Sequence, residues 1–344
     1  MTQTDTADAP AQATEPHRRR AARPLPLPLP LLHFAERYAL AGLLVVVGVF
    51  FTVLPASSQS FPTTANIQVL ASSQAVTLLI ALAALVPLAA GFFDFSAGAV
   101  AAASSVVMAG MMANHGLPLW TCVLAAFAVG LTVGFFNGLA VCVFGMNSFV
   151  ITLAAATLLG GGIQWYTHGQ TISKNISPAL IDFGSLTWGG IPRVLFVVAG
   201  ATLGIYYLVD QTPYGRSLRA MGDNPSAAKL VGIPVVRTGV GAFVIAGALA
   251  SLAGITLTAR IGGATADNGT AMIFPALAAV FLGATAIRPG HFNVFGTVFG
   301  VTLVAVSVSG LTLAGAADWV NPVFNGASLA VAVMISSYLG KRTR

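Results

Sequence analysis

The feature that most constrains how this chain can fold is a series of about ten apolar runs, most of them close to 20 residues long. A helix needs about 20 mainly apolar residues to cross the hydrocarbon core of a bilayer. Of the 344 residues, 56% are hydrophobic and only 8% are charged, whereas a soluble domain has about 25% charged residues. The sequence therefore predicts an all-α polytopic membrane protein, with spans near 38–54, 67–90, 96–113, 118–144, 147–168, 192–209, 238–259, 272–287, 292–314 and 319–339.

Basic residues are unevenly divided between the expected loops. With the N-terminus in the cytoplasm, 13 of the 16 Lys and Arg residues lie inside, and only Lys174, Arg193 and Arg260 lie outside. Positive residues gather in the cytoplasmic loops of membrane proteins, so the net charge of +6 indicates topology and not a nucleic-acid partner. We expect a disordered cytoplasmic tail over 1–36, a transmembrane domain over 37–340 and a cytoplasmic C-terminus at 341–344.

The first apolar run has a second interpretation, as the core of a signal peptide that ends near Pro55. The leader would be unusually long, and many further spans follow, so a signal-anchor helix is the simpler reading.

Glycines recur every four residues on one face of the fourth span, at Gly130, Gly134 and Gly138, and Gly200 pairs in the same way with Gly204. Small residues at this spacing let helices approach closely. We expect tight packing inside one bundle, with contact to a second copy as the alternative.

Several runs are interrupted where a lipid-facing helix would be continuous. Pro87 lies in the second span, Pro275 lies in the eighth, and residues 91–96 separate the second and third spans with almost no loop. Irregular backbone at membrane depth is tolerated only where protein or a water-filled cavity surrounds it. The breaks therefore favour broken helices around a transport path over a receptor or an anchor.

Polar residues within this apolar chain are few. Asp94 precedes an expected helix start, so its plainest role is an N-cap whose carboxylate accepts backbone N–H bonds. Because broken helices present polar groups to transport cavities, we list as a tentative translocation path Asp94, Ser96, Asn137, Asn147 and Thr152. Helix capping or interhelical hydrogen bonding is the alternative for these side chains.

Catalytic and metal-binding motifs are absent from the sequence. The three histidines within the expected membrane domain outside its first span, His115, His168 and His291, lack partners at metal-ligand spacing. No nucleophile elbow or phosphate-binding loop occurs, and intramembrane carboxylates that could relay protons are almost lacking. We expect no enzyme activity, no catalytic residues, and no metal or cofactor in this chain.

The basic hydrophilic segment from Asp210 to Arg237 is the longest polar stretch between spans. Asn224 or Asp223 can cap a short helix, Pro225 suits the first helical position, and Gly232 suits the exit. The segment thus predicts about two turns of helix in the cytoplasm.

This segment carries a resemblance. Thr212-Pro213-Tyr214-Gly215-Arg216, followed by the stretch from Ala220 to Ile233, closely resembles the cytoplasmic loop of ribose/xylose/galactose-type ABC transporter permeases. Residues 91–98, Asn137-Gly138, 149–153 and 248–263 resemble further motifs of that family in the same order. The chain departs from the family at Phe92, Phe93 and Phe95, where the family has small and aliphatic residues.

The resemblance implies a type II ABC importer-like permease of a bacterial cytoplasmic membrane, acting with a second permease copy, two cytoplasmic ATP-binding subunits and an extracytoplasmic solute-binding protein. ATP would be bound only by the partner subunits. The short helix would dock on an ATPase, with Leu230, Val231 and Ile233 in apolar contact and Arg216, Arg219 and Lys229 steering the encounter. The implied coupling residues are Gly215, Arg216, Gly222, Asn224, Pro225, Ala227, Ala228, Leu230, Gly232 and Ile233.

The implied substrate is a monosaccharide of the pentose or hexose class. Import of a nucleoside, a signalling furanose or a branched-chain amino acid by the same machinery is the second reading. An ion-coupled secondary carrier is a distant third.

Overall fold

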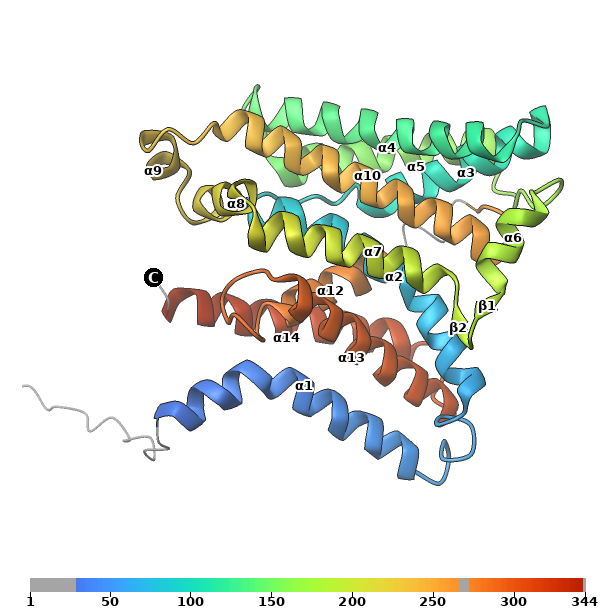
Figure 1. The fold of residues 1–344 in the computed structure, drawn as a ribbon, viewed down its shortest axis with the longest axis horizontal. Coiled ribbons are helices and arrows are strands. Elements are labelled where there is room, and N and C mark those ends of the chain that lie inside the picture. The colour runs from blue at the N-terminus through green and yellow to red at the C-terminus, as the bar shows by residue number, and fades with distance from the viewer. Residues whose placement is uncertain (1–28, 266–271, 343–344) are drawn as a thin grey trace, which may run out of the picture.

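The computed structural model describes residues 29–265 and 272–342 (Figure 1). Most of the described chain is helical, and its one small sheet is an antiparallel pair in which Thr187 faces Pro192. The elements, in order, are α1 Leu29–Val53, α2 Thr64–Ala89, α3 Ala97–His115, α4 Leu119–Cys142, α5 Ser148–Thr167, α6 Pro178–Ser185, β1 Thr187–Trp188, β2 Ile191–Pro192, α7 Val194–Tyr206, the π-helical turn η1 Tyr207–Gln211, α8 Pro213–Asp223, α9 Pro225–Leu230, α10 Val235–Ile261, α12 Ile273–Gly283, α13 Val294–Leu313 and α14 Val320–Arg342.

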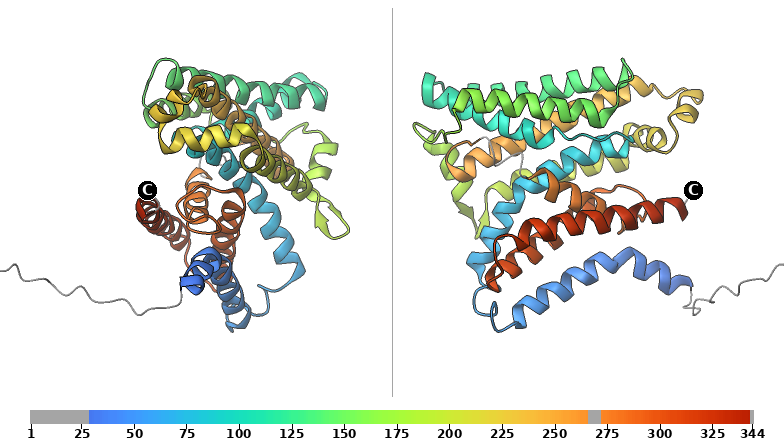
Figure 2. Two further views of the ribbon diagram at one scale, coloured as in Figure 1. Left: turned by 60° about the vertical axis from the view of Figure 1, so that its left-hand side comes forward. Right: turned by 180° about the vertical axis from the view of Figure 1, so that it is seen from behind.

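The long helices lie roughly side by side, and α10 crosses the upper half of the view diagonally, next to α4 (Figure 1). It packs against α2, α3 and α4. The largest apolar core joins α2 and α10 to α8, α12 and α13. Figure 2 shows α1 at the edge of the bundle, where it packs mainly against α13. The amphipathic helices α8 and α9 lie at the end of the bundle opposite α6 and the β-hairpin.

Among the described residues, seven helices are long and apolar enough to cross a membrane: α2, α3, α4, α5, α7 with η1, α10 and α13. The other three expected spans contain shorter apolar helices within α1, α12 and α14. Since an α-helix rises about 1.5 Å per residue, the 11 residues of α12 extend only about 16 Å, less than the bilayer core of about 30 Å. The all-helical polytopic class is confirmed, and the count of ten crossings stays a prediction.

The structure bears on the extent of the N-terminal tail and on the side at which the two chain ends lie. The expected tail over 1–36 is wrong for its last part, because α1 begins at Leu29; a helix start tolerates Pro30, since a proline early in the first turn loses no intrahelical bond. Residues 1–28 and 343–344 lie outside the described residues. Figure 1 places the start of α1 and the end of α14 at the α8 and α9 end, as an even number of crossings requires. Which compartment that end faces stays a prediction.

The glycine stripe of α4 lies directly on α10. A Cβ atom built on Gly130 would be 2.1 Å from the carbonyl oxygen of Gly247, and one on Gly134 would be 2.3 Å from that of Phe243. Real Cβ atoms do not approach so closely, so only glycine permits this backbone contact. Gly200 and Gly204 of α7 have nothing within 4 Å of such an atom, so the expectation of tight packing is confirmed for α4 and fails for α7.

We predict that Gly134→Ala lowers the free energy of unfolding in detergent by about 1–3 kcal/mol, because the added methyl group overpacks the contact with α10. Gly204→Ala is the matched control. It should be neutral or stabilising by up to about 1 kcal/mol, since alanine is the better helix former and meets open space. Thermal unfolding of the two purified variants checks this, and equal melting temperatures would contradict it.

Candidate functional site

The break between α2 and α3 is an extended segment, residues 91–96, held by the start of α5. The backbone N–H of Phe93 donates to Ser148 Oγ at 3.1 Å, and that of Phe95 donates to Thr152 Oγ1 at 2.9 Å. Pro87 lies in the last turn of α2, and Gly91 takes a left-handed conformation with φ of 84°. The expected break is confirmed, and side chains of α5 replace the hydrogen bonds that a helix would have supplied.

Asp94 and Ser96 form a buried polar centre within this segment. Both the N–H and the hydroxyl of Ser96 donate to Asp94 Oδ1, at 2.9 and 2.6 Å. Asn137 Nδ2 of α4 donates to Ser96 Oγ at 3.0 Å. The expected N-cap role of Asp94 is wrong in detail, because α3 begins after Ser96 and Asp94 fixes the residue that precedes the helix.

The tentative path residues therefore divide. Asp94, Ser96, Asn137 and Thr152 meet around residues 91–96, each buried and hydrogen-bonded to protein groups. Asn147 stands apart and caps α5, accepting from the N–H of Val150 at 3.2 Å. These contacts fit the alternative role of helix capping and interhelical hydrogen bonding, because they hold helices together or cap a helix end.

Of the two short helices α8 and α9, the sequence predicted only α9, and both have side-chain caps. Thr212 Oγ1 accepts from the N–H of Gly215, and Asn224 Oδ1 accepts from the N–H of Ala227 at 3.0 Å. Pro225 occupies the first position of α9, and Gly232 takes φ of 84° at its exit. Of the two capping residues that the sequence offered, the structure uses Asn224.

Burial separates the coupling residues into two groups. Gly215 and Ala228 are buried, and Gly222 and Ile233 are half-buried against the bundle. The exposed group faces away from it, with Leu230 at 88% and Val231 at 77% of full exposure. The exposed group contains Arg216, Asn224, Pro225, Ala227, Leu230, Val231 and Gly232. Ile233 packs against the chain's own core, so it is not part of the exposed apolar tip.

Gly222 brings α8 into backbone contact with the break. A Cβ atom on Gly222 would be 2.4 Å from the carbonyl oxygen of Ala89, and one on Gly91 would be 3.4 Å from the Cα of Gly222. Leu218 and Met221 of α8 are completely buried in the core that includes α2. The end of α2, the extended segment and α8 therefore form one packed unit.

Tyr214 fastens α8 to α10. Its hydroxyl donates to the carbonyl oxygen of Thr238 at 2.9 Å. Burial, with a smaller contribution from Cys142, raises the pKa of Tyr214 well above its usual value. The phenol thus remains a protonated donor at any physiological pH.

An ion-pair cluster that the sequence did not reveal lies beside α8. The buried carboxylate of Asp210 in η1 accepts from Arg219 of α8 at 2.5 Å and also from Arg288 in the loop between α12 and α13. Arg219 Nη2 further donates to the carbonyl oxygen of Val209 at 2.7 Å. Arg219 is therefore engaged within the chain, and its expected role in steering a partner stays a prediction. Separations of nine and 78 residues follow no helical spacing, so no sequence pattern signals the cluster.

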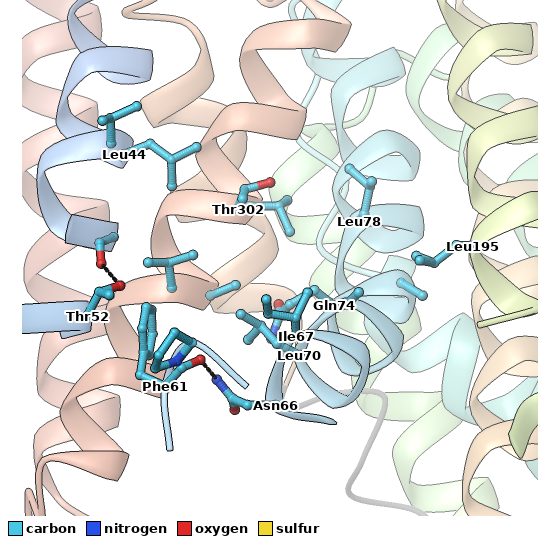
Figure 3. Close-up of a pocket in the computed structure, with 18 of the residues that line it drawn as sticks. Leu44, Thr52, Phe61, Asn66, Ile67, Leu70, Gln74, Leu78, Leu195 and Thr302 are labelled. Atoms are coloured by element: carbon cyan, nitrogen blue, oxygen red, sulfur yellow. Dashed lines mark hydrogen bonds between the residues drawn. The ribbon is translucent and has the colours of Figure 1, made fainter. Parts of the chain in front are cut away.

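A cavity of about 680 Å3 lies between α1, α2, α7 and α13 (Figure 3). Its lining is almost wholly apolar. Of its polar side chains, Asn66 donates to the carbonyl oxygen of Phe61 and Thr52 to that of Gly48. This cavity suits acyl chains better than a hydrated solute.

A smaller cavity of about 220 Å3 lies next to the extended segment, between α3, α5 and α12. Phe95, Thr157 and Phe274 are among its lining residues. In the described part of the chain, no three His, Cys, Asp or Glu side chains gather as metal ligands.

Comparison with known proteins agrees with this arrangement. Residues 66–334 match the family model described as branched-chain amino acid transport system / permease component. The chain is 32% identical to the ribose import permease protein RbsC of Bacillus subtilis over 292 residues, 84% of this chain and 90% of the relative. It is 27% identical to RbsC of Haemophilus influenzae, covering 89% and 94%. It is 29% identical to the autoinducer 2 import system permease protein LsrD of Photorhabdus laumondii, covering 88% and 91%. No solved structure matches the chain significantly.

We predict that Asp210→Asn lowers the free energy of unfolding by about 1–3 kcal/mol, because it removes the charge that pairs two arginines around a buried group. Asp182→Asn on α6 is the matched control, since Asp182 is exposed and should be neutral. Thermal unfolding in detergent measures both, and an unchanged Asp210→Asn protein would show that the cluster adds nothing to stability.

Proposed function

We propose that this chain, which belongs to the family of branched-chain amino acid transport system / permease components, moves a monosaccharide across the bacterial cytoplasmic membrane with ATP hydrolysed by a separate subunit. The coarser statement, that it is a permease component of a sugar ABC importer, follows from its relatives. The cargo and the energy source are our inference.

The observation that carries the proposal is the two-sided construction of α8 and α9. One side presents Leu230 and Val231 almost fully exposed, and the other packs Leu218 and Met221 completely into the bundle. Exposed apolar residues at the polar end of a membrane bundle are typical of a protein docking site. A partner that moves α9 would therefore move α8 and the end of α2 with it.

The route from the partner to the transport path runs through backbone contacts. Gly222 touches Ala89 at the end of α2, and the following segment is hydrogen-bonded to Ser148 and Thr152 of α5. Packed interiors transmit displacement because they have few voids. Closure of an ATPase dimer would in this way shift the extended segment relative to α5.

A sugar suits the path because the cavity beside Phe95 is lined without a charged side chain. An uncharged solute needs no counter-ion there, whereas moving an isolated charge from water into the cavity would be strongly unfavourable. Two of the relatives named above import ribose and one imports autoinducer 2. Autoinducer 2 is accordingly the second candidate cargo.

The remaining partners are proposals of the same kind. A second permease copy would complete the path, because the candidate span α5 is the least buried of the seven. An extracytoplasmic binding protein would deliver the solute to the end that carries α6 and the β-hairpin. ATP would be bound only by the cytoplasmic subunits.

The direct test is transport in vesicles that contain the chain together with its ATPase and binding-protein partners. We expect uptake of radiolabelled ribose to require both ATP and the binding protein, and a parallel assay with autoinducer 2 separates the two cargoes. Uptake by the chain alone, driven by an ion gradient, would overturn the proposal.

For the docking surface, we predict that Leu230→Glu removes most ATP-driven transport and weakens copurification of the ATPase at least about tenfold, since a charge would be buried in the interface. Its melting temperature should not change, because Leu230 touches little of its own chain. Leu186→Glu, which is also exposed but lies at the opposite end, should retain the ATPase. Normal ATPase binding by Leu230→Glu would exclude this surface as the docking site.

A further inference from the structure

Three phenylalanines from three separate elements meet beside the extended segment. Phe95 lies at their centre, with its ring 5.8 Å from that of Phe149 on α5 and 5.5 Å from that of Phe274 on α12. Both pairs are edge-to-face, with interplanar angles of 72°. This is a favourable geometry for aromatic rings, so the three side chains form one cluster, which we call the aromatic cluster.

The backbone beneath the cluster is fixed on two sides. The N–H of Phe95 donates to Thr152 Oγ1, which lies less than one helical turn from Phe149. The next residue, Ser96, is bonded to Asp94 and to Asn137 of α4. Phe95 thus projects from a stretch of backbone that is hydrogen-bonded on both sides of it.

The 220 Å3 cavity begins at the cluster and extends away from α8. Its walls include Ala99 on α3, together with Leu153 and Thr157 on α5. Both helices start near the break and run toward the opposite end of the bundle (Figure 1). Thr157 is eight residues beyond Phe149, or about 12 Å along the helix, so the cluster closes the cavity on the side nearer α8.

We propose that the aromatic cluster of Phe95, Phe149 and Phe274 is the barrier that closes the translocation path on the ATPase side and retains an uncharged polar solute in the cavity above it. This inference rests on the proposed function. Apolar constrictions close membrane pores by excluding water. A hydrated sugar cannot form hydrogen bonds to the three rings, so passage requires that the rings separate.

The cluster is placed to respond to the coupling helices. Gly91, which contacts Gly222 of α8, lies only four residues before Phe95. Phe149 and Phe274 belong to α5 and α12, whereas the described elements that pack most on α8 are α2, α9, α10 and η1. A displacement of α8 therefore reaches the central ring first, and the barrier opens when that displacement breaks the hydrogen bonds of Phe93 and Phe95 to α5.

Passive leak tests the barrier without ATP. The full chain is reconstituted in vesicles loaded with radiolabelled erythritol or ribose, and efflux is followed with no ATPase present. We expect Phe95→Ala to raise efflux of both probes about tenfold or more, because it removes both aromatic pairs and their bulk. Phe95→Leu, which retains an apolar side chain of moderate size, should leak far less than Phe95→Ala.

The matched control is Phe135→Ala on α4, whose ring pairs with Phe136 at 6.0 Å and lies exposed at the bundle surface. It should leak no more than the wild type. If Phe95→Ala does not assemble, Phe274→Ala decides in its place, since Phe274 is half exposed. Wild-type efflux from well-folded alanine variants would overturn the barrier. Because erythritol efflux requires neither ATP nor the correct sugar, leaky variants of a protein that imports no ribose would refute only the proposed cargo.

Discussion

The structure depends on one constraint: an extended backbone segment inside a membrane bundle must have its N–H groups bonded to protein. Residues 91–96 meet this requirement with hydroxyl groups of α5 and the carboxylate of Asp94. The two bonds to hydroxyl groups also fix the position of α5 relative to the segment, and Asn137 of α4 is joined to it by a bond to Ser96. The segment between α2 and α3 therefore joins α4 and α5. These bonds make it rigid enough to transmit a displacement.

The same requirement explains why polar residues of this chain are poor guides to its solute path. Asp94, Ser96, Asn137 and Thr152 were candidates because polar groups at membrane depth are expensive and usually functional. In the structure their hydrogen bonds go to one another and to backbone groups. Their function is to build the walls of the site. The surface left for a solute is mainly apolar, and its shape is set by phenylalanine rings.

Local sequence signals predicted the fold and the loop helices well. Apolar length identified the spans, Asn224 and Gly232 fixed the start and the exit of α9, and the spacing of Gly130 and Gly134 identified a close helix contact. These features depend on neighbours within about four residues. The same spacing misled for Gly200 and Gly204, because a small-residue stripe says nothing about whether a helix faces it.

Contacts between distant segments were beyond such reasoning. Asp210 meets Arg219 and Arg288 through the folding of three elements onto one end of the bundle, and the exposed tip of α9 could be separated from its buried side only by the observed burial.

The departures from the family at Phe92, Phe93 and Phe95 were visible in the sequence, although their consequence was not. In the structure Phe92 packs on Phe243 of α10 and Phe93 packs on Phe281 of α12. Two of the three rings therefore fasten the extended segment to these helices. Only Phe95 borders the cavity. The neighbouring rings therefore stiffen the frame around it, which restricts opening to motions large enough to carry the whole segment.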